Sequence, residues 1–376
     1  GMKASDSSRQ ALERRLAELH LREHAVLVGN GTTGLALLMQ ALGLQDREVA
    51  VPDSVCLNVP LGLRFGGARP EYLDNQWGDL GLDAEALATP RAERGAILAV
   101  HGYGQVSEMD PLLATARRQD LPLIEDACLA MGGTHHGRPV GSFGLASVIS
   151  FGAGKPLSLD HGGAVLTDDA ELAAELRALD AALPDFSEAA QARIDALGSA
   201  HTRLYNRCWP EGLAAEAPGF AAELLSASDA FLHRFDPQRL SQLAALLPRL
   251  PLLVRQRRDN FERLAALLAP LAGEALELLP LTPGAVPWRL NVLMQGRHEA
   301  MRALHAQGLH ASSWHPRASG FLPGTGADAA HPVAERLGRE ILNLWVDEQS
   351  TGAYAEAVRR TLEARLQAGQ DLTLSA

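Results

Sequence analysis

The segment Ser150-Phe151-Gly152-Ala153-Gly154-Lys155-Pro156 decides how the rest of the chain is interpreted. It closes the apolar run Val148-Ile149-Ser150-Phe151, which predicts a short strand that runs into a glycine-rich turn carrying one lysine. Residues 161–167 predict another strand. A lysine held between buried segments is poorly solvated, which favours the neutral amine that attacks a carbonyl. Taken alone, the segment leaves open the alternative of a surface lysine in a loop.

A second stretch, Leu121-Pro122-Leu123-Ile124-Glu125-Asp126-Ala127, predicts a buried strand that ends in two carboxylates. Asp126 falls where the strand becomes a loop, the usual place for a functional group in an open α/β sheet. A buried aspartate needs a partner, and a pyridinium nitrogen is one candidate. A lysine aldimine with an aspartate on the ring nitrogen is the pattern of pyridoxal 5'-phosphate (PLP). The alternatives are that Asp126 caps the next helix or pairs with an arginine.

A third stretch, Gly31-Thr32-Thr33, predicts a helix start that suits an anion. Backbone amides, side-chain hydroxyls and the positive end of the helix dipole meet there. The stretch is neither a P-loop nor G-x-G-x-x-G, and plain N-capping is the alternative. Together with Lys155 and Asp126 it supplies a phosphate site, to which Ser150 can add a hydroxyl.

Composition narrows the class of protein. The 376 residues suffice for two domains, and 47% hydrophobic with 21% charged residues is ordinary for a globular protein. The net charge of −11 argues against nucleic-acid binding but allows an anionic small ligand. Cys56, Cys128 and Cys208 are odd in number and widely spaced, which predicts no disulfide framework and no metal site. Without an N-terminal or spanning apolar run, we expect a cytoplasmic, non-membrane protein.

The pattern of elements predicts an α/β fold. Strands and helices alternate up to residue 127, which favours a mostly parallel sheet with helices on both faces. The strands after residue 145 lack intervening helices, so the sheet should be mixed. We expect a large domain over 8–245, with a helical segment at about 170–245, and a smaller C-terminal α+β domain over 246–370. Arg255, Arg257 and Arg258 are interpreted as a solvated basic face.

From about residue 12 to residue 366 the chain resembles the DegT/DnrJ/EryC1/StrS (sugar) aminotransferases, a branch of the fold-type-I PLP enzymes. The resemblance is densest from Ile97 to Asp169. The motifs that carry it are Asn30-Gly31-Thr32-Thr33-Gly34-Leu35, Val51-Pro52, Gly67-Ala68-Arg69-Pro70, His101-Gly102-Tyr103-Gly104-Gln105, Met109-Asp110, Glu125-Asp126-Ala127, the segment from Gly137 to Gly144, the segment from Ser150 to Lys155, and Gly162-Gly163-Ala164-Val165. The resemblance implies a large domain with a mixed sheet between helices and a smaller C-terminal domain.

The resemblance also implies roles for single residues. Lys155 matches the lysine that forms the internal aldimine and later moves the proton. Asp126 matches the aspartate on the pyridine nitrogen. Gly31, Thr32, Thr33 and Ser150 match the residues that bind the phosphate. The family works as a homodimer with shared active sites, and its partners are a small-molecule amino donor and a keto acceptor.

The chain departs from the family pattern at several cofactor and substrate positions. Cys56 stands where relatives place an aromatic residue on the cofactor ring, and Leu129 stands where they place a glutamine beside the cofactor hydroxyl. An Asn-Tyr-Arg motif is missing from the best-placed stretch, Gly219-Phe220-Ala221-Ala222-Glu223. Relatives begin with an extended N-terminal arm, whereas this sequence starts close to its first predicted helix.

Three functional hypotheses follow. The first is an aminotransferase that moves an amino group from a glutamate-like donor to a keto-sugar, with the nucleotide link left open. The second is a PLP-dependent lyase or epimerase on the same scaffold. The third is a PLP-binding protein with vestigial or regulatory activity, which Cys56 and Leu129 suggest. A lysine at position 155 argues against the dehydratase-like relatives, which carry a histidine there.

Overall fold

A seven-stranded sheet forms the centre of the larger part of the protein. The computed structural model describes residues 2–208 and 213–374. The strands of this sheet are β1 (His24–Val28), β2 (Glu48–Pro52), β3 (Arg69–Leu73), β4 (Arg94–Val100), β5 (Leu123–Asp126), β8 (Ala146–Ser150) and β9 (Gly163–Thr167). Their order is β1-β9-β8-β5-β4-β2-β3; the pairs from β3 to β8 are parallel, and β9 pairs antiparallel with β8 and β1. The predicted mixed sheet is confirmed.

Helices cover both faces of this sheet, which is why nearly all residues of its strands are buried. They are α1 (Met2–Leu19), α2 (Gly31–Ala41), α3 (Asn58–Phe65), α4 (Met109–Arg118) and α5 (Ala170–Ala181). Strand β1 shows the two-sided burial, because its side chains alternate between the faces. Val26 and Val28 pack in the cluster that contains α2 and α3, whereas Ala25 and Leu27 pack in the cluster that contains α1.

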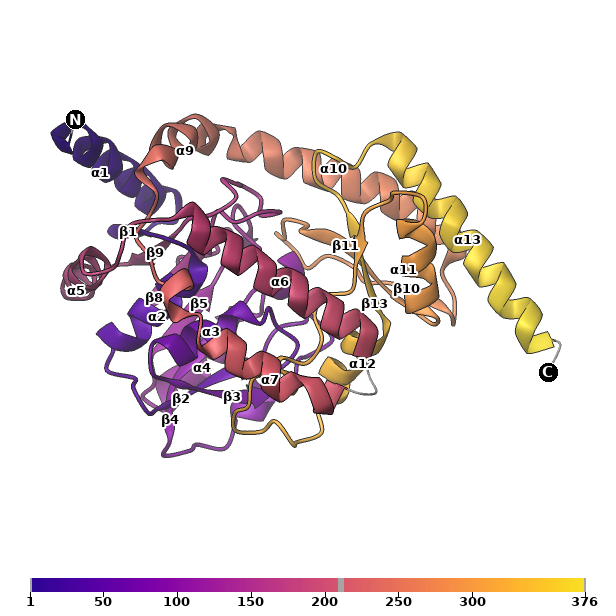
Figure 1. Ribbon diagram of the computed structural model, residues 1–376, viewed down its shortest axis with the longest axis horizontal. Helices are drawn as coiled ribbons and strands as arrows, with labels where there is room; N and C mark the ends of the chain where they lie inside the picture. The colour runs from indigo at the N-terminus through magenta and orange to yellow at the C-terminus, as the bar shows by residue number, and fades with distance from the viewer. Residues whose placement is uncertain (1, 209–212, 375–376) are drawn as a thin grey trace.

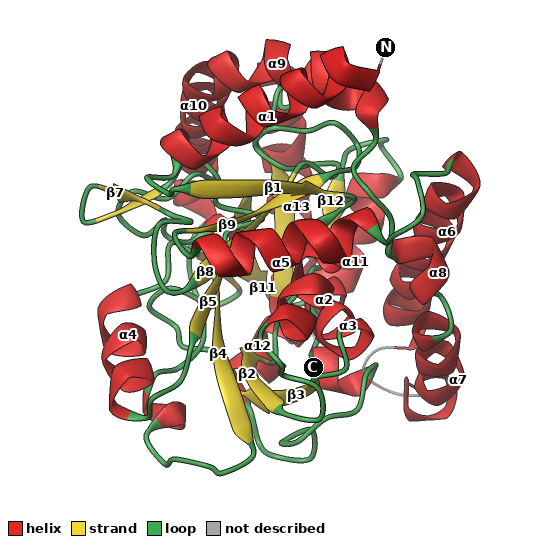
Figure 2. Cartoon of the chain, turned by 90° about the vertical axis from the view of Figure 1, so that its left-hand side faces the viewer, coloured by secondary structure: helices red, strands yellow, loops and turns green. Residues whose placement is uncertain are grey.

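A helical segment follows β9 and lies along one side of the sheet. Its helices are α6 (Glu188–Cys208), α7 (Leu213–Leu225), α8 (Ser228–Phe231) and α9 (Leu240–Leu246). Residues 209–212 of the predicted helical stretch lie outside the described residues. Figure 2 shows α4 on one side of the sheet and α6, α7 and α8 on the other. Residues of α6 and the last residues of β4, β5 and β8 line one cavity, so α6 reaches the edge of the sheet at which these strands end.

A second, smaller sheet forms the C-terminal part. Its strands are β10 (Leu276–Leu278), β11 (Arg289–Met294), β12 (Ala311–Ser312) and β13 (Ile341–Trp345), all antiparallel in the order β10-β11-β13-β12. The helices of this part are α10 (Leu250–Leu268), α11 (Arg297–His305), α12 (Pro332–Glu340) and α13 (Gly352–Leu374). The two termini lie at opposite ends of the long axis (Figure 1). The α+β character predicted for this part is confirmed.

Helix α10 joins the two parts. Leu250 and Val254 pack in a core cluster of the large sheet, whereas Leu264 and Leu268 pack against β10 and β11. The segment around Phe321 also returns to the core of the large sheet. The division into 8–245 and 246–370 therefore stays a prediction. Among the described residues, no helix combines the length and the apolar character that crossing a membrane requires.

Candidate active site

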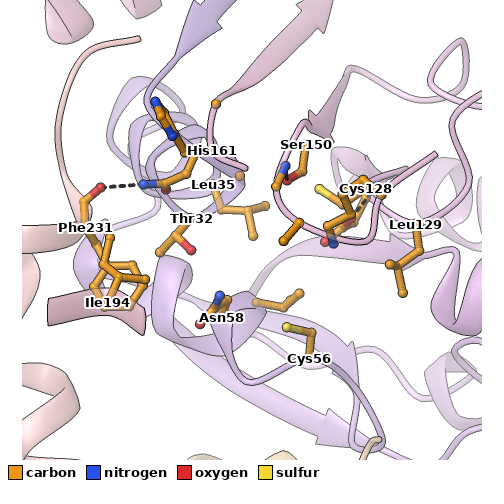
Figure 3. Close-up of a pocket in the computed structure, with 18 of the residues that line it drawn as sticks. Thr32, Leu35, Cys56, Asn58, Cys128, Leu129, Ser150, His161, Ile194 and Phe231 are labelled. Carbon is orange, nitrogen blue, oxygen red and sulfur yellow. Dashed lines mark hydrogen bonds between the residues drawn. The ribbon is translucent and has the colours of Figure 1, made fainter. Parts of the chain in front are cut away.

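A cavity of about 310 Å³ lies at the carboxyl edge of the large sheet. The last residues of three parallel strands line it: Val100 of β4, Asp126 of β5 and Ser150 of β8. The start of α2 and the turn that carries Lys155 complete the same wall. Figure 3 shows Ser150 and Cys128 on one side of the space and Cys56 and Asn58 on the other. This edge is where open α/β sheets bind their ligands.

Seven of the eight predicted site residues line this cavity. They are Gly31, Thr32, Cys56, Asp126, Leu129, Ser150 and Lys155. Thr33 does not line it, because its hydroxyl donates to the Phe231 carbonyl at 2.8 Å and its backbone N–H donates to Asn30 Oδ1 at 2.7 Å. Thr33 thus ties α2 to the end of α8, and its side chain is not available to a phosphate.

The two carboxylates at the end of β5 point to opposite faces of the sheet. Glu125 is fully buried and accepts the backbone N–H groups of Gly141 at 2.6 Å and Phe143 at 2.9 Å. Asp126 lines the cavity, and its Oδ1 accepts the Cys128 N–H at 3.0 Å. Asp126 therefore caps the following turn, but it forms no ion pair with any arginine that the structure describes.

His101 was quoted in a motif but not assigned to the site, and it lies beside Asp126 in the cavity. Its Nδ1 accepts the Ser107 N–H at 2.9 Å, so the proton sits on Nε2, which donates to Glu125 at 2.7 Å. Both side chains are fully buried. The pair therefore fixes the imidazole rigidly. The sequence signal was a histidine directly after a buried strand that runs parallel to β5.

The start of α2 forms the polar end of the cavity. Asn30 is the N-cap, and its Nδ2 also donates to the Phe231 carbonyl at 2.8 Å (dashed in Figure 3). Ser150 faces this helix start, and a Cβ on Gly31 would lie 3.2 Å from Cys128 Sγ and 3.6 Å from Ser150 Cβ. Glycine at position 31 thus keeps the helix start close to the end of β8, where an anion could meet both.

Arg257 of α10 holds the turn that carries Lys155 through hydrogen bonds to the backbone of that turn. The guanidinium donates to the carbonyls of Gly154 at 3.2 Å and Lys155 at 3.0 Å, and more weakly to those of Pro287 and Trp288. Arg257 is only 4% exposed, and burial lowers its pKa. The prediction of a solvated basic face is therefore wrong for Arg257, because α10 packs beneath the lysine turn.

Another part of the cavity lining is less polar. Cys56, Leu129 and Val55 line it, and burial raises the pKa of the Cys56 and Cys128 thiols, so both are neutral. His315 also lines the cavity. Burial, together with the neighbouring charge of Lys155, lowers its pKa to about 3. Neither Cys128 nor His315 is a site residue that the sequence predicts.

Helix α6 contributes Gln191, Ile194 and Asp195 to the rim. No motif marked these residues, because a polar stripe on an amphipathic helix is ordinarily solvated. Their contribution depends on where α6 lies beside the sheet, which only the folded chain shows (Figure 2).

A mixed sheet with a lysine turn, a strand-end aspartate and a helix start around one cavity defines the class of the protein as a fold-type-I PLP enzyme. Residues 3–200 match the DegT/DnrJ/EryC1/StrS aminotransferase family, which is more than half of the chain. The chain belongs to that family, and the predicted family is confirmed.

Similar proteins agree with this assignment. GDP-perosamine synthase of Caulobacter vibrioides is 41% identical over 161 residues, which is 42% of this chain and 43% of that protein. L-glutamine:scyllo-inosose aminotransferase of Streptomyces griseus is 39% identical over 150 residues, 39% of this chain and 35% of that protein. The match thus spans less than half the length of either relative. The crystal structure of DesI with its TDP-sugar product has a TM-score of 0.78 and 26% identity, and the match covers 98% of this chain and 87% of that one.

The family indicates PLP as the cofactor, and the cavity fits it. It offers an amine at Lys155, a carboxylate at Asp126 and a helix start beside Ser150. These are the groups that an aldehyde, a pyridinium nitrogen and a phosphate require. The fit is incomplete at Cys56 and Leu129, which offer neither an aromatic face nor a hydrogen-bond donor to the ring.

Proposed function

We propose that the protein is a PLP-dependent aminotransferase that moves an amino group from an amino acid, glutamate or a close analogue, to a keto-sugar. The observation that carries the proposal is the meeting of Lys155, Asp126 and the start of α2 in one cavity. Family membership and the sugar aminotransferases among the similar proteins support it.

In this proposal each residue has one task. The cofactor, when bound, supplies an electron sink for the substrate carbon. Lys155 Nζ would hold the cofactor covalently and would then carry the proton to and from that carbon. The Asp126 carboxylate would keep the ring nitrogen protonated, since a carboxylate in a site of low dielectric constant stabilises a cation strongly.

Neighbouring residues position these groups. Arg257 holds the backbone of the lysine turn, and the pair of His101 and Glu125 supports the wall beside Asp126. The start of α2, with Thr32 and Ser150, binds the phosphate. Rigid support of this kind keeps reacting atoms aligned, which is where much of the catalytic effect arises.

We further propose that the acceptor is nucleotide-linked and that the protein acts as a homodimer with active sites shared between subunits. The names of GDP-perosamine synthase and of DesI with its TDP-sugar product support the first point. The two-fold dimer is the commonest closed assembly, which supports the second point. Light scattering should then give twice the chain mass of 40.1 kDa. A fully active monomer would contradict the shared site.

The test is a panel of amino donors offered to the purified holoenzyme, read by the change of cofactor absorbance as its aminated form accumulates. Glutamate or glutamine should convert the cofactor in one half-reaction, and a nucleotide-linked keto-sugar should restore it. Conversion without restoration by any keto-sugar points to another acceptor. Decarboxylated or racemised donor points to the lyase or epimerase, and no conversion with any donor points to the vestigial protein.

A further inference from the structure

A cluster of histidines and carboxylates lies outside the cavity, between the hairpin that follows β5 and the start of α4. Glu108, His135 and His136 each offer a metal-ligating atom, and these atoms lie within 4.8 Å of one another. Asp110 lies against the same imidazoles: its Oδ1 is 3.7 Å from His135 Nε2 and its Oδ2 is 3.4 Å from His136 Nε2. The Glu108 carboxylate and two imidazoles thus lie close together, and the Asp110 carboxylate lies beside the imidazoles.

The hairpin turn brings the two histidines together. Strands β6 (Thr134–His135) and β7 (Arg138–Pro139) pair with His135 opposite Arg138, so the turn is His136-Gly137. Both turn residues have positive φ, 47° and 77°, as in a type I′ turn. Successive residues of a strand point to opposite faces. The left-handed backbone at His136 instead brings its ring to 4.1 Å from that of His135, centroid to centroid.

His135 points to a missing ligand. Its side chain is only 7% exposed, and its Nε2 is buried without a hydrogen-bond partner among the described residues. A buried polar atom without a partner costs free energy, which a ligand at that atom would recover. The remaining donors, on Glu108, Asp110 and His136, are on exposed residues and can adjust around an ion.

We propose that Glu108, Asp110, His135 and His136 form a zinc-binding site. Neutral imidazole and carboxylate ligands suit Zn²⁺, whereas Mg²⁺ and Ca²⁺ prefer oxygen ligands alone. The prediction of no metal site rested on the spacing of the cysteines, and this cluster uses none of them. A bound ion would link the hairpin of β6 and β7 to the start of α4. It would thus connect the segment that follows β5 with the segment that follows β4.

The test is calorimetric titration of the tag-free holoenzyme with Zn²⁺. His136→Asn removes an imidazole and keeps a residue that tolerates the left-handed backbone. Glu108→Gln removes a carboxylate on an exposed side chain. His310→Asn is the matched control, since His310 is exposed and lies outside the cluster. We expect one Zn²⁺ per chain, binding at least about tenfold weaker in His136→Asn and Glu108→Gln, and unchanged in His310→Asn.

A second measurement guards against zinc bound elsewhere. Zn²⁺ should raise the melting temperature of the wild-type protein and of His310→Asn, but not that of the two cluster variants. Absence of saturable binding overturns the proposal. Binding that is equally tight in His136→Asn and Glu108→Gln also overturns it, and would place the ion elsewhere, for example at the Cys56 and Cys128 thiols.

Discussion

The two sides of the cavity are built differently. On the side of β5, β8 and α2, the groups expected to react are set in defined hydrogen bonds: the Asp126 carboxylate accepts a backbone N–H, and Arg257 holds the lysine turn. The apolar side of the lining is formed by Cys56 and Leu129. The difference suggests that covalent and charged contacts to the cofactor are retained, whereas contacts to the face and edge of its ring are reduced.

The largest effect should come from Lys155. The chain has only two lysines, Lys3 and Lys155, so covalent labelling has few possible targets. Borohydride should fix the cofactor to the peptide that contains Lys155, and Lys155→Ala should abolish turnover because no other side chain in the cavity carries a primary amine. The control Lys3→Arg should label and turn over normally. A label on any other peptide would overturn the comparison between the two sides.

The second effect concerns the charge at Asp126. Asp126→Asn keeps the shape of the side chain and loses the charge that should hold the ring nitrogen protonated. We expect the cofactor still to bind and the amino half-reaction to slow by about two to four orders of magnitude, the scale of losing one partner of a buried charged pair. Stopped-flow absorbance measures this rate. Near-normal turnover would remove Asp126 from the mechanism.

The third effect is a loss of folding stability in acid, which arises from two buried histidines, His201 of α6 and His315. Burial lowers the pKa of His201 to about 4, and that of His315 to about 3. Because the unfolded chain protonates these histidines first, near pH 6.5, each should lower the free energy of unfolding by about 1.4 kcal/mol per pH unit below that value, until its folded pKa is reached. Above pH 6.5 neither should contribute.

Denaturant unfolding at pH 7 and pH 5 measures this loss. In His201→Gln the loss between the two values should shrink by about 2 kcal/mol. His310→Gln, which changes an exposed histidine, should behave as the wild type. An unchanged loss in His201→Gln would mean that His201 takes up its proton without unfolding.

Local patterns predicted most of the fold and the reactive side of the site. The apolar runs, the alternation of elements and the glycine-rich turn after β8 led to the mixed sheet and to Lys155, Asp126 and Ser150 at one edge. These residues could be found because Asp126 and Ser150 end buried strands and Lys155 lies in the turn after β8. Strands that run in parallel bring their carboxyl ends to the same edge of a sheet.

Contacts between distant segments could not be predicted in this way. Thr33 lies in the motif that predicts the phosphate site, but its hydroxyl donates a hydrogen bond to a carbonyl at the end of α8. Arg255 and Arg258, close to Arg257 in sequence, suggest a solvated basic face. In the fold, however, α10 places Arg257 in hydrogen-bonding contact with the turn that carries Lys155. The short strand β10, with three residues, is below the length at which alternation is informative.

The smallest effect tests the apolar side itself. An aromatic ring stacked on the cofactor contributes about 0.5–1.5 kcal/mol beyond area burial, and one hydrogen bond to its hydroxyl contributes about as much. Cys56 and Leu129 supply neither, whereas the covalent link at Lys155 and the contact at Asp126 are unaffected. The cofactor should therefore stay attached at rest and leave more readily in its aminated form, when the bond to Lys155 is open.

Cys56→Phe combined with Leu129→Gln should slow that release by about two- to tenfold for each contact restored. Cys56→Leu and Leu129→Met are the matched controls, because they add or keep apolar bulk without a ring or an amide. The measurement is the aminated cofactor released after one half-reaction, and the accepted donor should not change. Equal release from wild type and double variant would mean that other residues already hold the ring. Since His101 and His315 both line the cavity, they would then be the next side chains to replace.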